Sequence, residues 1–232
     1  ADEKTAKGKF KKEDLISKTC DEEHPRKYIE AKDISRYSIN RVRYLEYGTR
    51  RSPEKLSRKT FEQLYIVPKL FVNRLGGLEV CLDINNNFLH NDSIIGLVLW
   101  KDLKGIENKS ISGSIKKYSR YSRQEMEAFS EQVNLYYLLA ILNSTYAKHL
   151  LSIQRAGSLS IYPEHIRNLP IPIAPTKEME ELTALAKKQL ELHAKMSKAK
   201  LESEKDSLQT LITTIDAKID EIVYSIYGVD KR

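Results

Sequence analysis

The residues whose types and spacing could support hydrolysis lie between positions 83 and 109. Glu107-Asn108-Lys109 fits a Glu-x-Lys pattern, and Asp83 lies upstream of it. Nucleases of this kind hold magnesium with such groups on adjacent strands. Gly105 and its polar neighbours instead predict a turn at Glu107. A metal-dependent nuclease that uses Glu107 and Lys109 is therefore kept as a weak alternative, and we expect no catalytic residue in this chain.

A resident metal is not expected either. Cys20 and Cys81 are too few for a disulfide framework or a zinc site, and they predict free thiols in a reducing compartment. The histidines at 90, 149 and 165 show no ligand spacing. Surface or capping roles are the simpler interpretation of these histidines.

Binding to DNA fits the residue types better, because cations and small polar side chains gather in three stretches. Exposed cations contact phosphates, while Arg, Asn and Gln on loops read base edges. The first stretch holds Arg41, Arg43, Arg50, Arg51, Arg58 and Lys59. The second holds Lys116, Lys117, Tyr118, Arg120, Tyr121 and Arg123, and the third holds Gln154, Arg155 and Ser158. Lys69 and Arg74 are weaker candidates, because one of them could be half-buried beside Tyr or Trp100.

The charge of the chain is uneven and agrees with a polyanionic partner. The 232 residues carry a net charge of +7. Residues 176–232 hold ten Lys/Arg and eleven Asp/Glu, so residues 1–175 hold 29 basic and 21 acidic residues and a net charge of +8. A basic domain followed by a neutral tail suits nucleic acid. An alternative is a basic surface that binds nothing anionic.

The residue patterns around these candidate sites predict helices and strands that together form an α+β domain over 26–175. An apolar helix over 135–153 is interrupted at Asn143-Ser144-Thr145, which can cap a second helix. A polar loop over 155–160, a helical turn from Pro163 and an extended apolar segment over 169–173 follow. The third cationic stretch therefore stands on a loop held out from a buried helix.

The part before that helix predicts a small, mostly antiparallel sheet flanked by helices. We expect an extended piece from Arg26, a helical turn over 33–37, strands over 42–47, 69–75, 78–83 and 94–100, and a helix over 53–65. Gly76-Gly77 predicts a hairpin. Residues 108–124 have no periodic apolar face and predict a loop or a loosely held hairpin. Residues 1–25 predict a poorly ordered segment or one short helix over 11–19.

The segment 176–232 predicts a C-terminal helical hairpin resembling a coiled coil. Its two leucine and isoleucine stripes are out of phase, which places a break within 202–207. One long bent helix is the alternative. Gly228 is the expected helix stop.

Several motifs share their order with a known family. The motif ILNS at 141–144, the Gly-Ser loop and NLPIP at 168–172 come in the order found in specificity (target-recognition) domains of restriction-modification enzymes. AKDISRY at 31–37, the pattern from Leu64 to Leu99 and the ending IDEIVYSIYG at 219–228 agree with it. The chain resembles the TaqI-like C-terminal specificity domain of adenine-specific DNA methyltransferases, and more distantly type I specificity subunits.

The resemblance implies sequence-specific recognition of double-stranded DNA for a methyltransferase or type II restriction enzyme. The Asn-Pro-Pro-Tyr loop and the Gly-rich cofactor turn of such methyltransferases are missing from this chain, so catalysis would lie upstream, in cis. The parent would bind S-adenosylmethionine, and magnesium if it also cleaves DNA, whereas this chain would bind no cofactor. The chain opens on Ala1, and we expect it to be a piece of a longer polypeptide.

Two further expectations concern location and the rival function. No apolar run reaches the roughly 18 residues of a membrane span and no signal peptide is visible, so we expect a cytoplasmic protein without a membrane partner. The rival is a protein-interaction module that works through its C-terminal helices, with an incidental basic surface.

Overall fold

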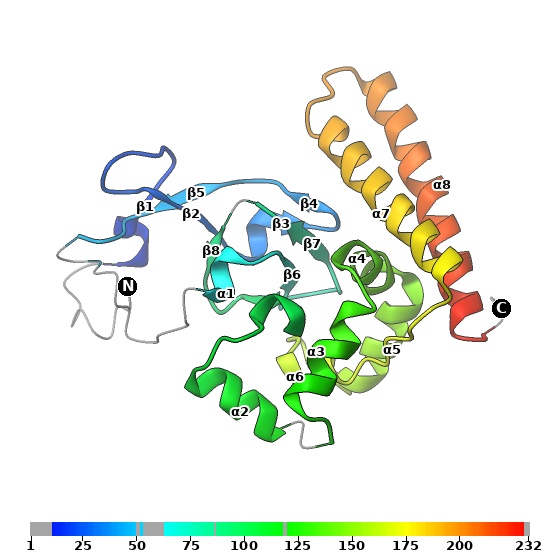
Figure 1. Cartoon of the computed structure of the whole chain (residues 1–232). Coiled ribbons are helices and arrows are strands. Elements are labelled where there is room, and N and C mark those ends of the chain that lie inside the picture. The colour runs from blue at the N-terminus through cyan, green and yellow to red at the C-terminus, as the bar shows by residue number, and fades with distance from the viewer. Residues whose placement is uncertain (1–10, 50–51, 53–62, 86, 118–119, 230–232) are drawn as a thin grey trace.

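The protein is α+β, as the sequence predicts (Figure 1). The computed structural model describes residues 11–49, 52, 63–85, 87–117 and 120–229. The strands are β1 (Ile16–Ser17), β2 (Arg26–Ile29), β3 (Ile34–Ser35), β4 (Ser38–Ile39), β5 (Arg43–Leu45), β6 (Lys69–Asn73), β7 (Val80–Asp83), β8 (Leu89–His90) and β9 (Ile94–Leu97). The α-helices are α1 (Gln63–Ile66), α2 (Lys109–Lys117), α3 (Arg123–Glu131), α4 (Leu135–Asn143), α5 (Thr145–Arg155), α6 (Pro163–Arg167), α7 (Thr176–Met196) and α8 (Glu202–Ile226). Short 3₁₀ helices are η1 (Lys12–Leu15), η2 (Ala31–Asp33) and η3 (Trp100–Leu103).

Two sheets and one small hairpin form the centre. One sheet has the antiparallel order β7-β6-β9, and the second has the order β1-β5-β2-β8, in which β2 and β8 run parallel. The central strand β6 is buried along its whole length. Leu70 and Val72 join the core that contains α4, whereas Phe71 packs with Ile29 and Phe88 beneath the second sheet. This alternation shows that β6 is covered on both faces.

Residues 11–25 are folded, with η1 inside the expected short helix over 11–19, and residues 1–10 lie outside the described part of the chain. Within 11–25, η1 is followed by β1, which pairs with β5 through Ile16 and Leu45, and Leu15 is buried. The segment is therefore part of the second sheet, because one leucine and two pairing residues suffice to hold it there. The expected helical turn over 33–37 is also replaced by η2 and the β3–β4 hairpin, whose turn includes Tyr37 at φ 59°.

The prediction of an irregular segment over 108–124 is wrong, because this segment contains α2 and the start of α3. The Asn108 side chain accepts hydrogen bonds from the Ser110 and Ile111 amides at 2.9 and 3.0 Å, which caps the first turn of α2. Ile111 is buried and Ile115, four residues later, is half-buried. One such pair gives the helix a single narrow contact with the body, and α2 lies at the edge of the molecule (Figure 1).

The predicted break at 143–145 is confirmed and has a second role. The Ser144 side chain accepts a hydrogen bond from the Ala147 amide at 3.1 Å and starts α5. The Asn143 side chain accepts from the Val80 amide at 3.1 Å and donates to the Val80 carbonyl at 2.9 Å. Asn143 therefore pairs with the edge of β7 as another strand would, and this joins α4 to the sheet.

The C-terminal hairpin is confirmed, with its break at 197–201, slightly before the expected 202–207. Gly228 has φ 64° just after the end of α8, in agreement with the predicted stop. Leu182, Ala186, Ile219 and Val223 belong to the same core as α4 and β6. The half of the hairpin near the body is thus docked, and the other half projects away from it (Figure 1). None of the helices that the structure describes is long and apolar enough to cross a membrane.

Candidate nucleic-acid interface

The two described residues of the first cationic stretch, Arg41 and Arg43, supply internal ion pairs. Arg43 places Nη2 at 2.9 Å from Glu30 Oε2 and also donates to Asp33, while Arg41 Nη2 lies 2.6 Å from Asp33 Oδ1. The Asp33 and Glu30 side chains are almost wholly buried. Burial acts to raise the pKa of Asp33, but the hydrogen bonds from Arg43 and Arg41 outweigh it and keep this pKa below its ordinary value. Arg43 is therefore a structural residue. Arg41 is half-exposed, but its charge is already paired with the Asp33 carboxylate.

Lys69 is also structural. Its side chain is 2% exposed, and Nζ lies 3.1 Å from Asp83 Oδ2 and donates to the carbonyls of Tyr65 and Val67 at 2.6 and 2.9 Å. Burial lowers the pKa of Lys69 in spite of the Asp83 charge. Because β6 is the central strand, a lysine at its first residue is enclosed by the body and cannot reach DNA.

The third stretch is anchored beside the β6–β7 hairpin. Arg155 donates from Nε to the Ser158 carbonyl at 2.8 Å and from Nη1 to the Gly76 carbonyl at 2.7 Å. Ser158 donates to the Ser160 carbonyl, and Gln154 to the Asn168 carbonyl, both at 3.1 Å. The side chains of the third stretch thus hold its own loop in shape, while Arg155 stays half-exposed.

Arg74 joins the same corner of the molecule from the hairpin. It donates to the carbonyls of Ile161 and Asp92 at 3.2 and 2.5 Å, and its guanidinium lies 5.4 Å from the ring centroid of Tyr162. Within the described residues, Arg74 and Arg155 bond to carbonyl oxygens and form no ion pair. Their positive charge is therefore not cancelled by a carboxylate.

The second stretch is exposed at and after the C-terminal end of α2. Lys116 and Arg120 are exposed and, among the residues that the structure describes, have no ion-pair partner. Lys117 reaches Glu164 at 2.5 Å, and Tyr121 packs edge-on against Phe129. Arg123 is different, because it is held by Glu127 at 2.8 Å and by the Leu103 carbonyl at 2.9 Å.

These contacts show that the segments holding the second and third stretches adjoin one another. The Lys117–Glu164 ion pair joins α2 to α6. The Arg74 guanidinium lies over the ring of Tyr162, the residue just before α6. Leu75 forms a β-bridge with Ser160 and so joins the hairpin to the loop. We call the surface of these segments the basic face, and its cations are Arg74, Lys116, Lys117, Arg120, Arg155 and Arg167. Arg167, which pairs with Glu164 at 3.4 Å, was not predicted, although its place in the turn after Pro163 is visible in the sequence.

Five predicted residues lie outside the described part of the chain: Arg50, Arg51, Arg58, Lys59 and Tyr118. The expected helix over 53–65 lies there too, except for the residues in α1.

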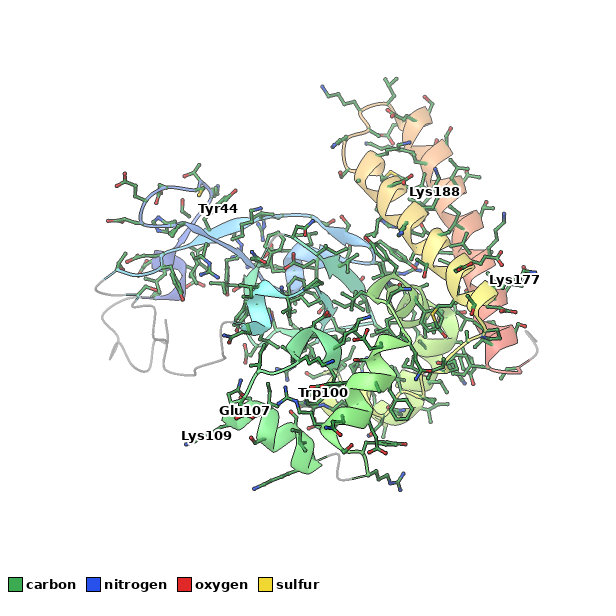
Figure 2. The ribbon with its side chains drawn as sticks, viewed as in Figure 1. Tyr44, Trp100, Glu107, Lys109, Lys177 and Lys188 are labelled. Atoms are coloured by element: carbon green, nitrogen blue, oxygen red, sulfur yellow. The ribbon has the colours of Figure 1, made fainter. Side chains whose placement is uncertain are left out.

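The groups weighed for hydrolysis do not form a common site. Glu107 and Lys109 lie at the surface at the start of α2 (Figure 2), whereas Asp83 is buried against Lys69. Among the described residues, no group of three or more His, Cys, Asp or Glu side chains could hold a metal ion. His90 packs against Phe71 at a ring distance of 5.4 Å, which indicates a role in the core.

Comparison with known proteins gives no independent assignment. No protein-family model matches the chain, and no curated protein sequence matches it at a significant level.

Proposed function

We propose that this chain recognises double-stranded DNA in a sequence-specific way and that the basic face is its contact surface. The observation that carries the proposal is the basic face itself, on which Arg74, Lys116, Arg120 and Arg155 keep charges that no described carboxylate cancels. DNA affinity depends mainly on such cations near phosphates. Arg41, Arg43 and Lys69 are excluded from the proposed contact because they serve internal ion pairs.

The shape of α2 favours the same function. A peripheral helix, held through Ile111 and bearing lysines at its end, has the form of an element that can enter the major groove, which admits one α-helix. Ser110 and Ser114 give it small hydroxyl donors, whereas the Ser112 hydroxyl donates to the Asn108 carbonyl. Contacts to base edges from this helix would add specificity to the phosphate contacts.

The family resemblance in the sequence supports the wider context. In that context the parent is a site-specific adenine methyltransferase or type II restriction enzyme of the cytoplasm, with S-adenosylmethionine bound upstream. The chain described here then supplies recognition and no catalysis, while the methyltransferase flips the target adenine out of the duplex.

The rival helical interaction module is less well supported. The leucine and isoleucine stripes of α7 and α8 pack against each other and against α4. Arg36 also fixes α8 to the body through Asp216 at 2.8 Å. Stripes that are already covered in this way are not available to a partner helix.

The test is the salt dependence of DNA binding by the 232-residue chain. Duplexes enriched from a random-sequence pool are titrated by fluorescence anisotropy between low and moderate salt. Each lost phosphate contact should reduce the slope of log Kd against log salt by about 0.9. Lys116→Ala with Arg120→Ala should therefore reduce the slope by about 1.8.

The matched control removes the same charge from the C-terminal hairpin, by Lys177→Ala with Lys195→Ala. Both lysines are exposed on α7, and Lys177 lies far from the start of α2 (Figure 2). An unchanged slope in this control supports the proposal. Equal effects of the two double variants, or the absence of any enriched duplex, would refute it.

A further inference from the structure

The loop between α5 and α6 presents one large apolar side chain to solvent. Leu159 is 86% exposed, more than any other large hydrophobic residue that the structure describes. Its neighbours Ser158 and Ser160 are small and polar, and Ala156 and Gly157 precede them. The loop is therefore narrow, with Leu159 as the single bulky group between positions 156 and 160.

The loop is held in a defined conformation. Ala156 and Gly157 have φ of 45° and 85°, which turns the chain sharply after α5. The Ser158 amide donates to the Arg155 carbonyl at 2.8 Å, and Arg155 in turn holds the Ser158 and Gly76 carbonyls. The bridge between Ser160 and Leu75 fixes the far side. The backbone on both sides of Leu159 is thus held by hydrogen bonds, and these bonds keep the Leu159 side chain in solvent.

The surroundings of Leu159 decide which partner fits. Arg155 and Arg74 flank the loop, and both direct their hydrogen bonds to carbonyl oxygens, so the apolar tip stands within a positive field. An apolar protein surface would leave these two charges without counter-charges. Duplex DNA offers both parts together, since phosphates line its grooves and the stacked bases between them are apolar.

We propose that Leu159 acts as a wedge that enters the base stack of the bound duplex from the minor groove. Apolar side chains that do this partly unstack one base step and kink the duplex. The minor groove is about 6 Å wide, so the Leu159 side chain can enter it, while the small Ala, Gly and Ser residues around it let the backbone approach the groove closely. Arg74 and Arg155 then contact the phosphates on either side. The inference rests on the proposed DNA recognition and adds how one segment deforms the DNA.

The test uses the 232-residue chain and a duplex enriched from a random-sequence pool, with 2-aminopurine placed at one position after another. Its fluorescence rises when stacking is lost. We expect a rise at one step with the unchanged chain and none with Leu159→Ala. Because no cation is removed, Leu159→Ala should keep the salt slope of binding and weaken Kd by less than about tenfold.

Leu211→Ala is the matched control, since Leu211 is a 50% exposed leucine on α8, outside the basic face. It should leave both the fluorescence rise and Kd unchanged. Thermal unfolding of the two variants should match that of the unchanged chain, because both side chains are exposed.

Three outcomes overturn the wedge and are distinguishable. A duplex that binds with normal salt dependence but shows no unstacking, or equal unstacking with Leu159→Ala, removes the wedge and leaves DNA recognition in place. Dissociation of a chain dimer by Leu159→Ala in sedimentation, with unchanged DNA complexes, assigns Leu159 to a protein contact. Failure to enrich any duplex removes the proposed function and the wedge together.

Discussion

Replacement of Asp216 by alanine should destabilise the whole protein, because this residue joins the C-terminal hairpin to the body. Arg36 donates to both oxygens of Asp216, at 2.9 and 2.8 Å, and to the Asn143 carbonyl at 3.1 Å. Gln189 Nε2 adds a third hydrogen bond to Asp216 at 2.8 Å. Burial acts to lower the pKa of Arg36, but the Asp216 carboxylate outweighs it and raises this pKa. The pair is therefore favourable in the folded state.

The magnitude follows from what Asp216→Ala leaves behind. A guanidinium and an amide lose their common acceptor, and removing one partner of a fully buried pair costs about 3–5 kcal/mol. The Arg36 and Asp216 side chains are 29% and 23% exposed, so water can replace part of the contact. We therefore expect a loss of about 2–3 kcal/mol in the free energy of unfolding. For a chain of this size that corresponds to a decrease in Tm of about 4–12 °C.

Urea unfolding followed by circular dichroism measures this loss, and the exposed pair Glu202–Lys205 provides the control. These two side chains are 81% and 39% exposed, so Lys205→Ala should change the free energy by less than about 1 kcal/mol. Arg36→Ala together with Asp216→Ala should cost less than the sum of the single variants. Additive losses, or an Asp216→Ala loss as small as that of Lys205→Ala, would show that packing alone docks the hairpin.

Two further predictions concern buried titratable groups. Burial and the Arg36 charge lower the pKa of His193 below 6.5, so the unfolded chain binds this proton first as pH falls. The stability that depends on neutral His193 is fully present above about pH 6.5 and is lost on acidification. His193→Gln should therefore reduce the loss in the free energy of urea unfolding between neutral and acidic pH, and an unchanged loss would contradict this assignment. Lys69→Ala should cost about 3–5 kcal/mol in the same assay, because it removes the ammonium that lies 3.1 Å from the buried Asp83 carboxylate, and a loss below about 1 kcal/mol would contradict the assigned ion pair.

The parts of the fold that sequence could predict are those fixed by local contacts. The break between α4 and α5 depends on Ser144 and the next few amides, and the stop of α8 on one glycine. Both can be recognised from residue types a few positions apart. The sequence does not predict the helix α2, because its apolar signal is limited to Ile111 and Ile115 among Ser, Gly and Lys, and the burial of Ile111 is decided by distant segments. The cap at Asn108 is a local signal, but an asparagine is equally common in turns.

The candidate site was harder to predict than the fold, because charge alone does not distinguish a free cation from a paired one. Arg43 and Lys116 each count as one positive charge in the sequence. The strand β5 places Arg43 beside Glu30 and Asp33, so its charge is paired within the protein. Lys116 stays exposed to solvent because α2 lies at the edge of the molecule. Exposure and pairing are tertiary properties, so the net charge of +8 over residues 1–175 overstates the surface available to DNA.

The basic face is joined to the sheet and to the C-terminal helices through Asn143 and α5. Asn143 pairs with Val80 on β7, and its carbonyl accepts from Arg36, which holds α8. The helix α5 follows directly from this joint and ends at Arg155, the anchor of the Leu159 loop. The position of the loop is therefore set by α5, by the sheet hairpin at Gly76 and by the docked C-terminal helices at once. The DNA recognition that we propose needs such a frame, because a binding surface with few contacts of its own must have its side chains positioned before binding.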